Sequence, residues 1–505
     1  MLANPQLVPT GKNWAVASRA QAITLNIPLV IQVLETGGYY AEGDGGGASF
    51  MRVAGPVSDG ASFQSNDGAY WEIIGPVYND KQFGTYGDDS HDDTTAIQNA
   101  LNILAPGVVM KFGQGPYKIT DTLNYGDGTT LAVSSFGMNA TVLWGGETSY
   151  INALIDTSDP FYGSMNFGTH FKWYGAAGGT MFKVNGPIFG GRWIGALVLD
   201  GQALYDGATG AANCYQAYSA GFFTIDTIVA VNWQASGMGV LWDTLNSTGI
   251  SGNANNVLSG GNRIGKIFSY SPYGHNGVCV KFDGYAAAGG QDFTVSQIGL
   301  IQCGISGNNA IGVMLGYVDD VYIEQIVNTV YGSISGNPYG VFLLGFSTPF
   351  EVPARVRITK AAVGQGISVG GGSNAQVIID EYEMDDAATL PSVNGLFIKF
   401  ISRTGNAQDQ MAFPSTGLLK TRAYGSGEGW QGLDNSNNVI WSLTREGSGM
   451  RITSIANMEF EPVGYLVSAK LQSSASYAND AAAAAGGVPV GGLYRNGSVV
   501  QIRIT

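Results

Sequence analysis

Five carboxylates stand beside copies of one short strand motif, and their spacing suits acid–base chemistry. They are Asp243, Asp283, Asp319, Asp320 and Glu324. Asp283 follows its motif with an offset of two residues from Asp243, so in stacked copies their Cα atoms should lie about 8 Å apart. This separation suits an inverting glycosidase, in which one acid protonates the leaving oxygen and the other activates water. Asp319-Asp320 end the matching strand of the next copy, and Glu324 begins the following strand.

These acids also have a structural interpretation. Lys281 aligns directly above Asp243, and such a cross-strand ion pair would serve the fold alone. The acidic run from Asp380 to Asp386 indicates either a solvated rim or a second glycan site. A lyase would need a Lys, Arg or Tyr base and a group that neutralises a uronate, sometimes calcium. The sequence has no dense acidic cluster with calcium-loop spacing, so it favours hydrolysis by analogy.

Aromatic and histidine side chains near the acids are candidates for stacking on sugar rings. They are Trp233, Tyr270, Tyr273, His275 and Tyr317. In a stacked fold such side chains often form ladders between coils, so both interpretations stay open.

Two motifs recur through the middle of the chain with a period of about thirty to forty residues, which predicts a solenoid. The first is an alternating strand at 224–228, 263–267, 294–298, 322–326 and 357–361. The second is a Gly-Val strand at 239–242, 277–280, 312–315 and 340–343. The apolar columns expected inside are Ile225/Ile264/Val295/Ile323/Ile358 and Val240/Val278/Val313/Val341.

The second motif is apolar on both of its faces. Its outward positions are Leu241, Cys279, Met314 and Phe342. A strand that is apolar on both faces is covered on both faces, so this stripe predicts an interface. The alternative is a terminal loop folded over the stripe.

Residues 83–132 have the pattern of a capped helix followed by short strands. The acidic pair Asp92-Asp93 is expected to cap a helix whose apolar residues recur at i, i+3, i+4 and i+7 from Ile97. Pro106-Gly107 ends this helix, and short strands bounded by Gly, Asp or Asn follow. The pattern is typical of a parallel β-helix with a helix covering its open end.

The segment FGTYGDDSHDDTTAIQNAL, with GPYKITDTL downstream, resembles the opening of pectate-lyase-like right-handed β-helix proteins, and in particular of bacteriophage tailspikes. It departs from that pattern in two turns, at residues 88–91 and 113–116. GGYYAEGDGGGASF, with DGAYWEIIG behind it, is similar to segments that precede such domains in phage tail proteins. SYANDAAAAAGGVPVGGLYRNGSVVQIRIT is similar to their C-terminal segments.

The fold expected from these observations is all-β, a right-handed parallel β-helix forming a three-sheet solenoid with an N-terminal capping helix. Residues 1–78 are the expected virion-attachment module. Residues 79–400 are the expected receptor-binding or depolymerase domain, and residues 401–505 the β-rich trimerisation region. The resemblance implies a homotrimer that docks through its N-terminus to a phage tail, baseplate or adaptor protein. The stripe and the C-terminal Asn-Gly hairpin are the expected trimer contacts.

The resemblance also implies a virion tail protein, assembled in the host cytoplasm, that acts at the bacterial cell surface. It would bind a bacterial surface polysaccharide and cleave it as an endoglycosidase. The alternatives are a non-catalytic receptor-binding tail protein and a polysaccharide lyase. The sequence does not identify the glycan or the host.

Composition argues against several other classes of function. The net charge is -14 with no cluster of Lys or Arg, which disfavours nucleic acid and anionic membranes as partners. Three cysteines without CxxC spacing and three scattered histidines disfavour a disulfide framework and a zinc site, and we expect no cofactor and no metal. No apolar segment approaches the ~20 residues of a membrane span. Gly43–Gly47 lacks a following Lys-Ser/Thr and predicts a turn, not a phosphate loop.

Overall fold

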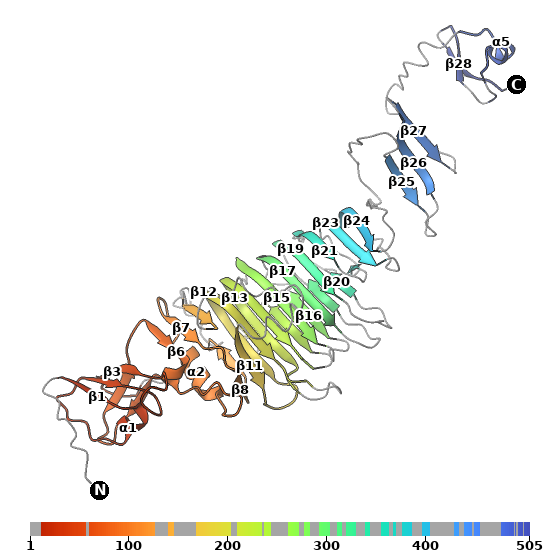
Figure 1. The fold of residues 1–505 in the computed structure, drawn as a ribbon. Coiled ribbons are helices and arrows are strands. Elements are labelled where there is room, and N and C mark those ends of the chain that lie inside the picture. Colours follow the sequence, from red (N-terminus) through yellow and green to blue (C-terminus); the bar gives the residue numbers. More distant parts are fainter. Residues whose placement is uncertain are drawn as a thin grey trace, which may run out of the picture. The chain divides into compact units, whose positions relative to one another are not determined.

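The computed structural model describes residues 12–504, and strands make up most of it (Figure 1). The gaps in this description are 57–59, 127–139, 146–167, 204–209, 235–236, 244–260, 272–276, 283–291, 304–310, 316–319, 330–338, 344–354, 363–366, 370–375, 386–395, 405–428, 434–438, 447–448, 455–475, 489, 491–492 and 498. The chain divides into two compact units, Met1–Gly417 and Leu418–Thr505.

Residues 12–74 fold around one mixed sheet with the order β1-β2-β3-β5-β4. The strands are β1 (Asn13–Val16), β2 (Val33–Thr36), β3 (Ala48–Val53), β4 (Ser62–Gln64) and β5 (Tyr70–Ile73), with helix α1 (Arg19–Ile23) after β1. The β1–β2 pair is parallel and the other pairs are antiparallel. Leu34, Phe50 and Trp71 are buried between the sheet and its connections, and they belong to the same core cluster as the buried residues of the coils that follow.

The segment just before β2 forms a turn around Leu29. The Arg52 guanidinium group donates hydrogen bonds to the carbonyl oxygens of Ile27, Pro28 and Ile31 at 2.9–3.0 Å, which hold the turn in place. Leu29 at its tip is 80% exposed.

The glycine-rich segment Gly43–Gly47 is a turn, as predicted. The Asp44 carboxylate accepts hydrogen bonds from the backbone amides of Tyr39, Tyr40, Ala41 and Gly46 at 2.7–3.1 Å. Burial alone would raise the pKa of Asp44, but these amides outweigh it and hold the pKa below its usual value. The amides that a phosphate would need are therefore occupied by the protein's own carboxylate.

A helix precedes the coils, as predicted. Strand β6 (Val77–Asn79) leads through the 3₁₀ helix η1 (Asp80–Phe83) to helix α2 (Thr94–Asn102). Ile97, Ala100 and Leu101 on one face of α2 are fully or almost fully buried, so this face packs on the core.

The predicted helix cap is right for one of its two acids. Asp92 accepts a hydrogen bond from the Thr94 amide at 3.0 Å, at the first turn of α2. Asp93 makes no side-chain cap bond. Its carboxylate accepts the amides of Tyr86 and Gly87 at 2.6 and 2.9 Å and is fully buried, because the preceding loop folds back over it.

Three faces of stacked parallel strands form the coils, named here A, B and C. Face A contains β6, β7 (Val109–Phe112), β10 (Thr141–Trp144), the later-middle part of β12 (Thr180–Asp200), the middle of β13 (Asn213–Val231) and the first halves of β15 (Asn262–Ser271), β17 (Asp292–Cys303), β19 (Asp320–Thr329), β21 (Arg355–Ala362), β23 (Gln376–Asp385) and β24 (Leu396–Thr404). Face B contains β8 (Tyr117–Ile119), β11 (Thr169–Trp173) and the last parts of the same long strands. Face C contains β9 (Leu123–Tyr125), the first parts of β12 and β13, β14 (Met238–Asp243), β16 (Val278–Phe282), β18 (Ile311–Leu315), β20 (Tyr339–Leu343) and β22 (Ile367–Val369).

The first predicted interior column is confirmed residue by residue. Ile225, Ile264, Val295, Ile323 and Ile358 are Cα partners in successive strands of face A, and each is at most 2% exposed. Stacking identical positions in this way gives every coil the same inward side chain. The parallel β-helix predicted from the sequence is therefore confirmed, and neighbouring coils lie side by side in Figure 1.

The second predicted column is wrong at one coil. Val240 lies opposite Val280, and Val278 lies opposite Met238. The prediction aligned two Gly-Val pairs, whereas the fold places the large buried rings of Trp242 and Phe282 opposite each other.

The same shift breaks the predicted outward stripe. Leu241 lies opposite Lys281, which in turn lies opposite Met314, so a cation stands where an apolar residue was expected. Cys279 belongs to the core cluster, is fully buried and is disulfide-bonded. The side chain of Phe342 lies outside the described residues.

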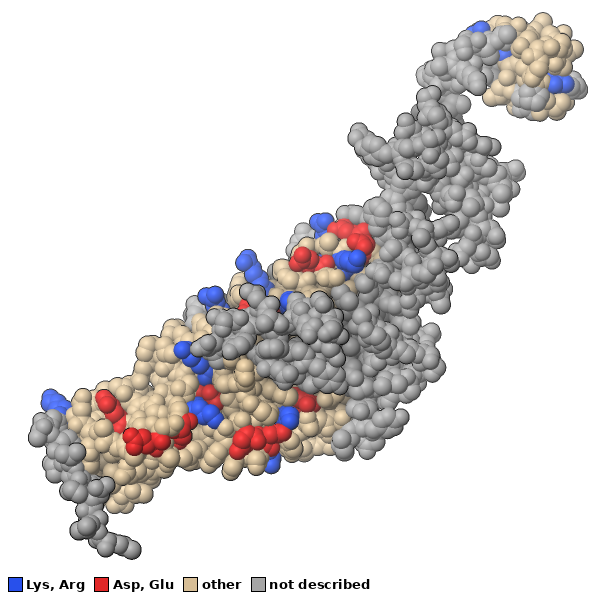
Figure 2. All heavy atoms as spheres, viewed as in Figure 1, with Lys and Arg blue, Asp and Glu red and all other residues tan. Residues whose placement is uncertain are grey.

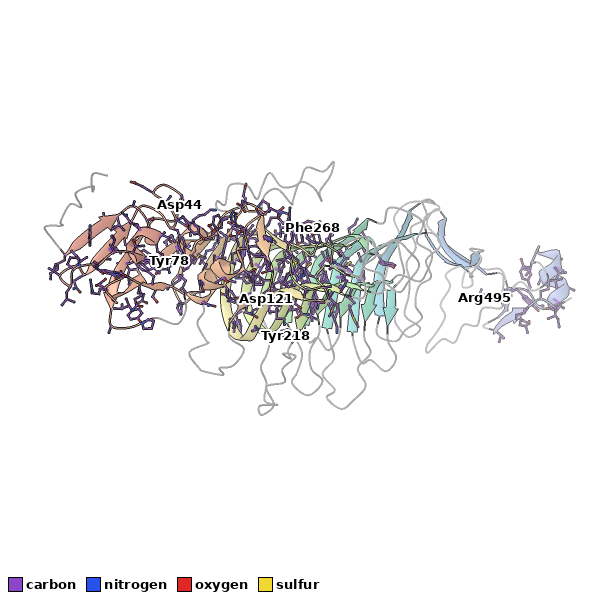
Figure 3. The ribbon with its side chains drawn as sticks, turned by 90° about the horizontal axis from the view of Figure 1, so that it is seen from below. Asp44, Tyr78, Asp121, Tyr218, Phe268 and Arg495 are labelled. Carbon is purple, nitrogen blue, oxygen red and sulfur yellow. The ribbon has the colours of Figure 1, made fainter. Side chains whose placement is uncertain are left out.

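Face B carries a small second apolar cluster. Ala196, Val198, Val229 and Val231 are at most 2% exposed and pack with Phe268, apart from the main core. Figure 3 shows Phe268 of face B and Tyr218 of face C on opposite sides of the coils. An apolar layer outside the main core is thus present on face B, where it was not predicted.

The second unit contains a three-stranded antiparallel sheet and a helix-backed hairpin. The strands are β25 (Gly429–Leu433), β26 (Val439–Glu446), β27 (Gly449–Ser454), β28 (Leu493–Asn496) and β29 (Val499–Ile502), with helix α5 (Asp480–Ala485) before the hairpin. The predicted Asn-Gly hairpin is confirmed. Buried Tyr494 donates a hydrogen bond to Asp480 of α5 at 2.7 Å, while Leu493, Ile502 and Ile504 remain 48–75% exposed.

No helix among the described residues is long and apolar enough to cross a membrane.

Candidate functional site

The predicted acids lie at two different corners of the coils. Asp243 ends β14 on face C, with its Cα opposite that of Tyr218. Asp320 begins β19 on face A, with its Cα between those of Asp292 and Arg355. Both therefore border the connection from face C to face A, but in different coils. Their side chains, and all of Asp283 and Asp319, lie outside the described residues.

The distance predicted for the acid pair rests on a register that the structure contradicts. The offset of two residues came from aligning Leu241 with Cys279, whereas Leu241 lies opposite Lys281. The estimate of about 8 Å between the Cα atoms of Asp243 and Asp283 therefore loses its basis. The predicted ion pair between Asp243 and Lys281 loses its basis for the same reason.

Glu324 lies at the corner between faces A and B. It is the one residue of β19 that stays unpaired between the two faces, and its side chain is exposed. It is therefore separated from the other predicted acids by the width of face A.

The predicted aromatic residues lie at the remaining corner, between faces B and C, or outside the description. The prediction for Trp233 is wrong: its side chain is fully buried, and a Cβ added to Gly277 would lie 2.2 Å from its ring. Trp233 thus fills the space beside glycines and cannot stack on a sugar. Tyr270 pairs with Val231 on face B. Tyr273, His275 and Tyr317 lie outside the described residues.

The acidic run after Asp380 is partly paired with bases of the preceding coil. Arg357 donates two hydrogen bonds to Asp380 Oδ2 at 2.8 and 3.0 Å, and Lys360 Nζ lies 2.9 Å from Glu381 Oε1. Tyr382 within this run is fully buried. These residues therefore act in stacking the coils, and residues 386–395 lie outside the description.

A polar cluster on face B joins the capping loop to the first coils. Asp89, with a φ of 60°, accepts hydrogen bonds from Lys172 Nζ at 2.6 Å and from the Tyr174 hydroxyl at 3.1 Å. Burial lowers the pKa of Lys172, but the Asp89 carboxylate outweighs it and raises the pKa. Burial and Asp89 both raise the pKa of Tyr174. Neither group is therefore poised to act as a base near neutral pH.

The neighbouring acid Asp200 is held in its ionised state. It is 6% exposed and accepts hydrogen bonds from the Gln202 amide and the Asn232 side chain at 3.0 and 2.9 Å. His170 Nε2 lies 3.8 Å away, beyond a normal hydrogen bond. Burial raises the pKa of Asp200, but these partners outweigh it and lower the pKa. This cluster fits anchoring of the loop better than proton transfer.

Among the described residues, no group of three or more His, Cys, Asp or Glu side chains could hold a metal ion.

Sequence reasoning missed the outward side of face A. Its exposed residues alternate with the interior column and are Arg192, Thr224, Arg263, Thr294, Tyr322 and Arg357, each the Cα partner of the next. The signal was present, because the aligned repeats place each of these residues directly before its interior partner. Figure 2 shows Lys and Arg groups at intervals along the side on which Figure 1 labels β12 to β21.

The comparisons with known proteins give no family for the chain. No protein-family model matches it, and no curated protein matches it. Among solved structures, the tailspike protein gp49 of Acinetobacter baumannii bacteriophage Fri1, a capsular polysaccharide depolymerase, is 12% identical with a TM-score of 0.35, covering 90% of this chain and 94% of that one. ORF18 of Geobacillus virus E2 is 12% identical with a TM-score of 0.38, covering 98% and 99%. Pantoea stewartii WceF, a glycan biofilm modifying enzyme with a tailspike-like parallel β-helix fold, is 12% identical with a TM-score of 0.33, covering 85% and 56%. At this level of likeness, the fold assignment rests on the strand pairing itself.

Proposed function

We propose that this chain is a bacteriophage tailspike that binds a bacterial surface polysaccharide and cleaves it by glycosidic hydrolysis. One observation carries the proposal: the segment with the tailspike-like opening motif folds into helix α2, which packs at the start of a parallel β-helix running from β6 to β24. The exposed outer faces of such a solenoid offer a long surface to an extended polymer.

In this proposal the three regions of the chain have separate roles. Residues 1–78 attach the spike to the phage tail, baseplate or adaptor protein, residues 79–400 bind the polysaccharide, and residues 401–505 hold three chains together. Exposed Leu493 and Ile502, which are cross-strand partners in a hairpin, support the last role, because a two-stranded hairpin alone is marginally stable. Three copies would cover these side chains.

The proposed chemistry uses two of the five predicted carboxylates. Asp243, Asp283, Asp319 and Asp320 all border the connection from face C to face A in sequence order, so the acid pair is sought first among them. Glu324 at the next corner is the remaining candidate. One member of the pair must stay protonated near neutral pH, which requires partial burial or a like-charged neighbour.

The experiment is a digestion of polysaccharides purified from a panel of bacteria, with the products sized by chromatography. A hydrolase makes new reducing ends alone, and a lyase also makes products that absorb as unsaturated uronates. The Asp283→Asn and Asp320→Asn variants should keep binding while cleavage falls by about 10²–10⁴-fold. Full activity in both variants would place the chemistry elsewhere. A wild-type chain that leaves every polysaccharide intact and unbound would end the proposal.

A non-catalytic receptor-binding protein is the second candidate, and one observation favours it. Burial raises the pKa of Asp93, whose side chain is fully buried beneath the capping loop. Asp93 is thus out of reach of a polymer and cannot act as the general acid. Binding without any change in polymer length would select this candidate.

A further inference from the structure

One patch on face A combines an exposed aromatic ring with two cations that have no acidic partner. We define the Arg–Phe patch as Arg192, Phe222, Thr224 and Arg263. Thr224 is the Cα partner of Arg192 in the coil before and of Arg263 in the coil after. Neighbouring strands lie ~4.8 Å apart, so the two arginines stand about 10 Å apart along the solenoid.

The two arginines are available to a ligand. Both side chains are exposed, and among the described residues no carboxylate lies at ion-pair distance from either. Arg357 in the same column is paired with Asp380 and so differs from them. Asp226, two residues after Thr224 in β13, uses Oδ2 to accept the Gly195 amide at 3.0 Å. In a chain of net charge -14, two unpaired guanidinium groups on one line form a local site for negative charge.

Phe222 supplies the apolar part of the patch. Its side chain is 62% exposed, whereas Phe223 beside it and Trp193 in the coil before are at most 1% exposed. A Cβ on Gly261 would lie 2.6 Å from Phe222 Cδ1, so the absence of a side chain at Gly261 lets the ring lie against the next coil. The φ of 58° at Phe222 is rare for a bulky residue. The ring thus lies against the next coil, and more than half of the residue's surface is exposed to solvent.

We propose that the Arg–Phe patch binds an acidic sugar of the polysaccharide, an inference that rests on the proposed function. The sugar ring lies on Phe222, and the guanidinium groups of Arg192 and Arg263 bind carboxylate or phosphate groups on the polymer. Arginine suits this role because its planar donors match such groups in pairs. The Thr224 hydroxyl between them is a donor and acceptor for a sugar hydroxyl. Tyr322, farther along face A and 38% exposed, extends the same surface along the solenoid.

An acidic glycan fits the patch better than nucleic acid does. Nucleic acid carries a charge on every nucleotide and needs a broad basic surface, whereas the cations here form a single file. The rest of the chain is acidic and would repel such a polymer. A sugar polymer with widely spaced negative charges can place them at the two arginines, so that few of its charges lie near the acidic side chains around the patch.

The test measures binding of the full chain to a panel of purified acidic and neutral bacterial polysaccharides by biolayer interferometry. The variants are Arg192→Gln, Arg263→Gln, the double variant and Phe222→Ala. Lys183→Gln is the matched control, because it removes one positive charge from face C, where Lys183 pairs with Asn124 and Gln216. Circular dichroism of each variant confirms that the fold is kept.

We expect each Arg→Gln change to raise Kd for the bound acidic glycan by at least tenfold, or about 1.4 kcal/mol. Phe222→Ala should weaken binding severalfold and Lys183→Gln should leave it unchanged. Reducing the carboxylates of the glycan to alcohols, or removing its phosphates, should weaken wild-type binding and barely affect the double variant. Whichever treatment has this effect identifies the charged group.

The outcomes separate this inference from the proposed function. If the wild-type chain binds none of the polysaccharides, both fail. If it binds only neutral glycans, or if the arginine variants bind an acidic glycan as the wild type does, the inference fails and the tailspike proposal stands. Single-stranded DNA that binds with the same dependence on Arg192 and Arg263 would also overturn it, because the patch would then be a general polyanion site.

Discussion

Replacing Ile323 by alanine tests the interior column most directly. Ile323 is fully buried between Val295 and Ile358 of the adjacent coils. The change removes three carbon atoms, worth about 2.4 kcal/mol at ~0.8 kcal/mol each, and the cavity left behind adds to this. We expect a loss of about 3–4 kcal/mol in the free energy of unfolding. Tyr322→Ala is the matched control, because the Tyr322 side chain points outward. The change removes its hydroxyl contact with Thr359 at 3.1 Å, so we expect the free energy of unfolding to fall by about 1 kcal/mol or less.

The assay is urea unfolding of the full chain, with tryptophan fluorescence as the readout. Coils of a solenoid contact mainly their neighbours and can open locally. Hydrogen exchange of the β19 amides should therefore be measured as well as urea unfolding. In Ile323→Ala these amides should exchange faster, together with those of β17 and β21. A loss below about 1 kcal/mol in Ile323→Ala, or an equal loss in Tyr322→Ala, would refute the assignment of inward and outward residues.

Three further predictions concern the capping region, acid stability and assembly. Tyr117→Phe removes a 2.6 Å hydrogen bond to the buried Asp80 carboxylate and should lower stability by about 1.5–3 kcal/mol, which thermal unfolding can measure; an unchanged melting temperature would contradict it. The folded-state pKa values of Asp200 and Asp44 are lowered, so their stabilisation is present above about pH 4 and is lost as pH falls through the folded values. Asp200→Asn should therefore flatten the dependence of unfolding free energy on pH below 4, and a curve as steep as that of the wild type would argue against this account. Leu493→Asp should convert the proposed trimer to smaller species in light scattering, and a monomeric wild type would disprove the assembly itself.

The sequence predicted the interior of face A because its repeats align without gaps. Ile225, Ile264 and Ile358 each sit in an alternating strand, and the pattern alone sets which side chains point inward. Face C was harder, since its strands are shorter and the Gly277-Val278 pair stands two residues before the position that aligns with Gly239-Val240. Packing of Trp242 opposite Phe282, and not the motif, decided the register there.

The candidate site was predicted less well for a related reason. Residues such as Asp283 and Tyr317 lie in connections whose lengths vary from coil to coil, so periodicity carries no information about their positions. The prediction that Trp233 stacks on a sugar failed because its burial in the corner between faces B and C depends on the glycines around it. Phe222 was missed because its exposure follows from a backbone angle that no pattern of residue types indicates.

The corner between faces A and B consists of a single unpaired residue in seven successive strands, which are β13, β15, β17, β19, β21, β23 and β24. The connection from face C to face A, in contrast, ranges from residues 244–261 to residues 316–319. An inserted codon at the first corner would turn every following side chain of that strand to the opposite face. In the connection, doubling the length costs only ~0.6 kcal/mol of chain entropy. The connection from face C to face A should therefore tolerate insertions and deletions, whether they are inherited, recombined from related genes or grafted on purpose. The corner between faces A and B should not tolerate them. The residues of the connection from face C to face A can therefore diversify while the paired strands beside them stay fixed.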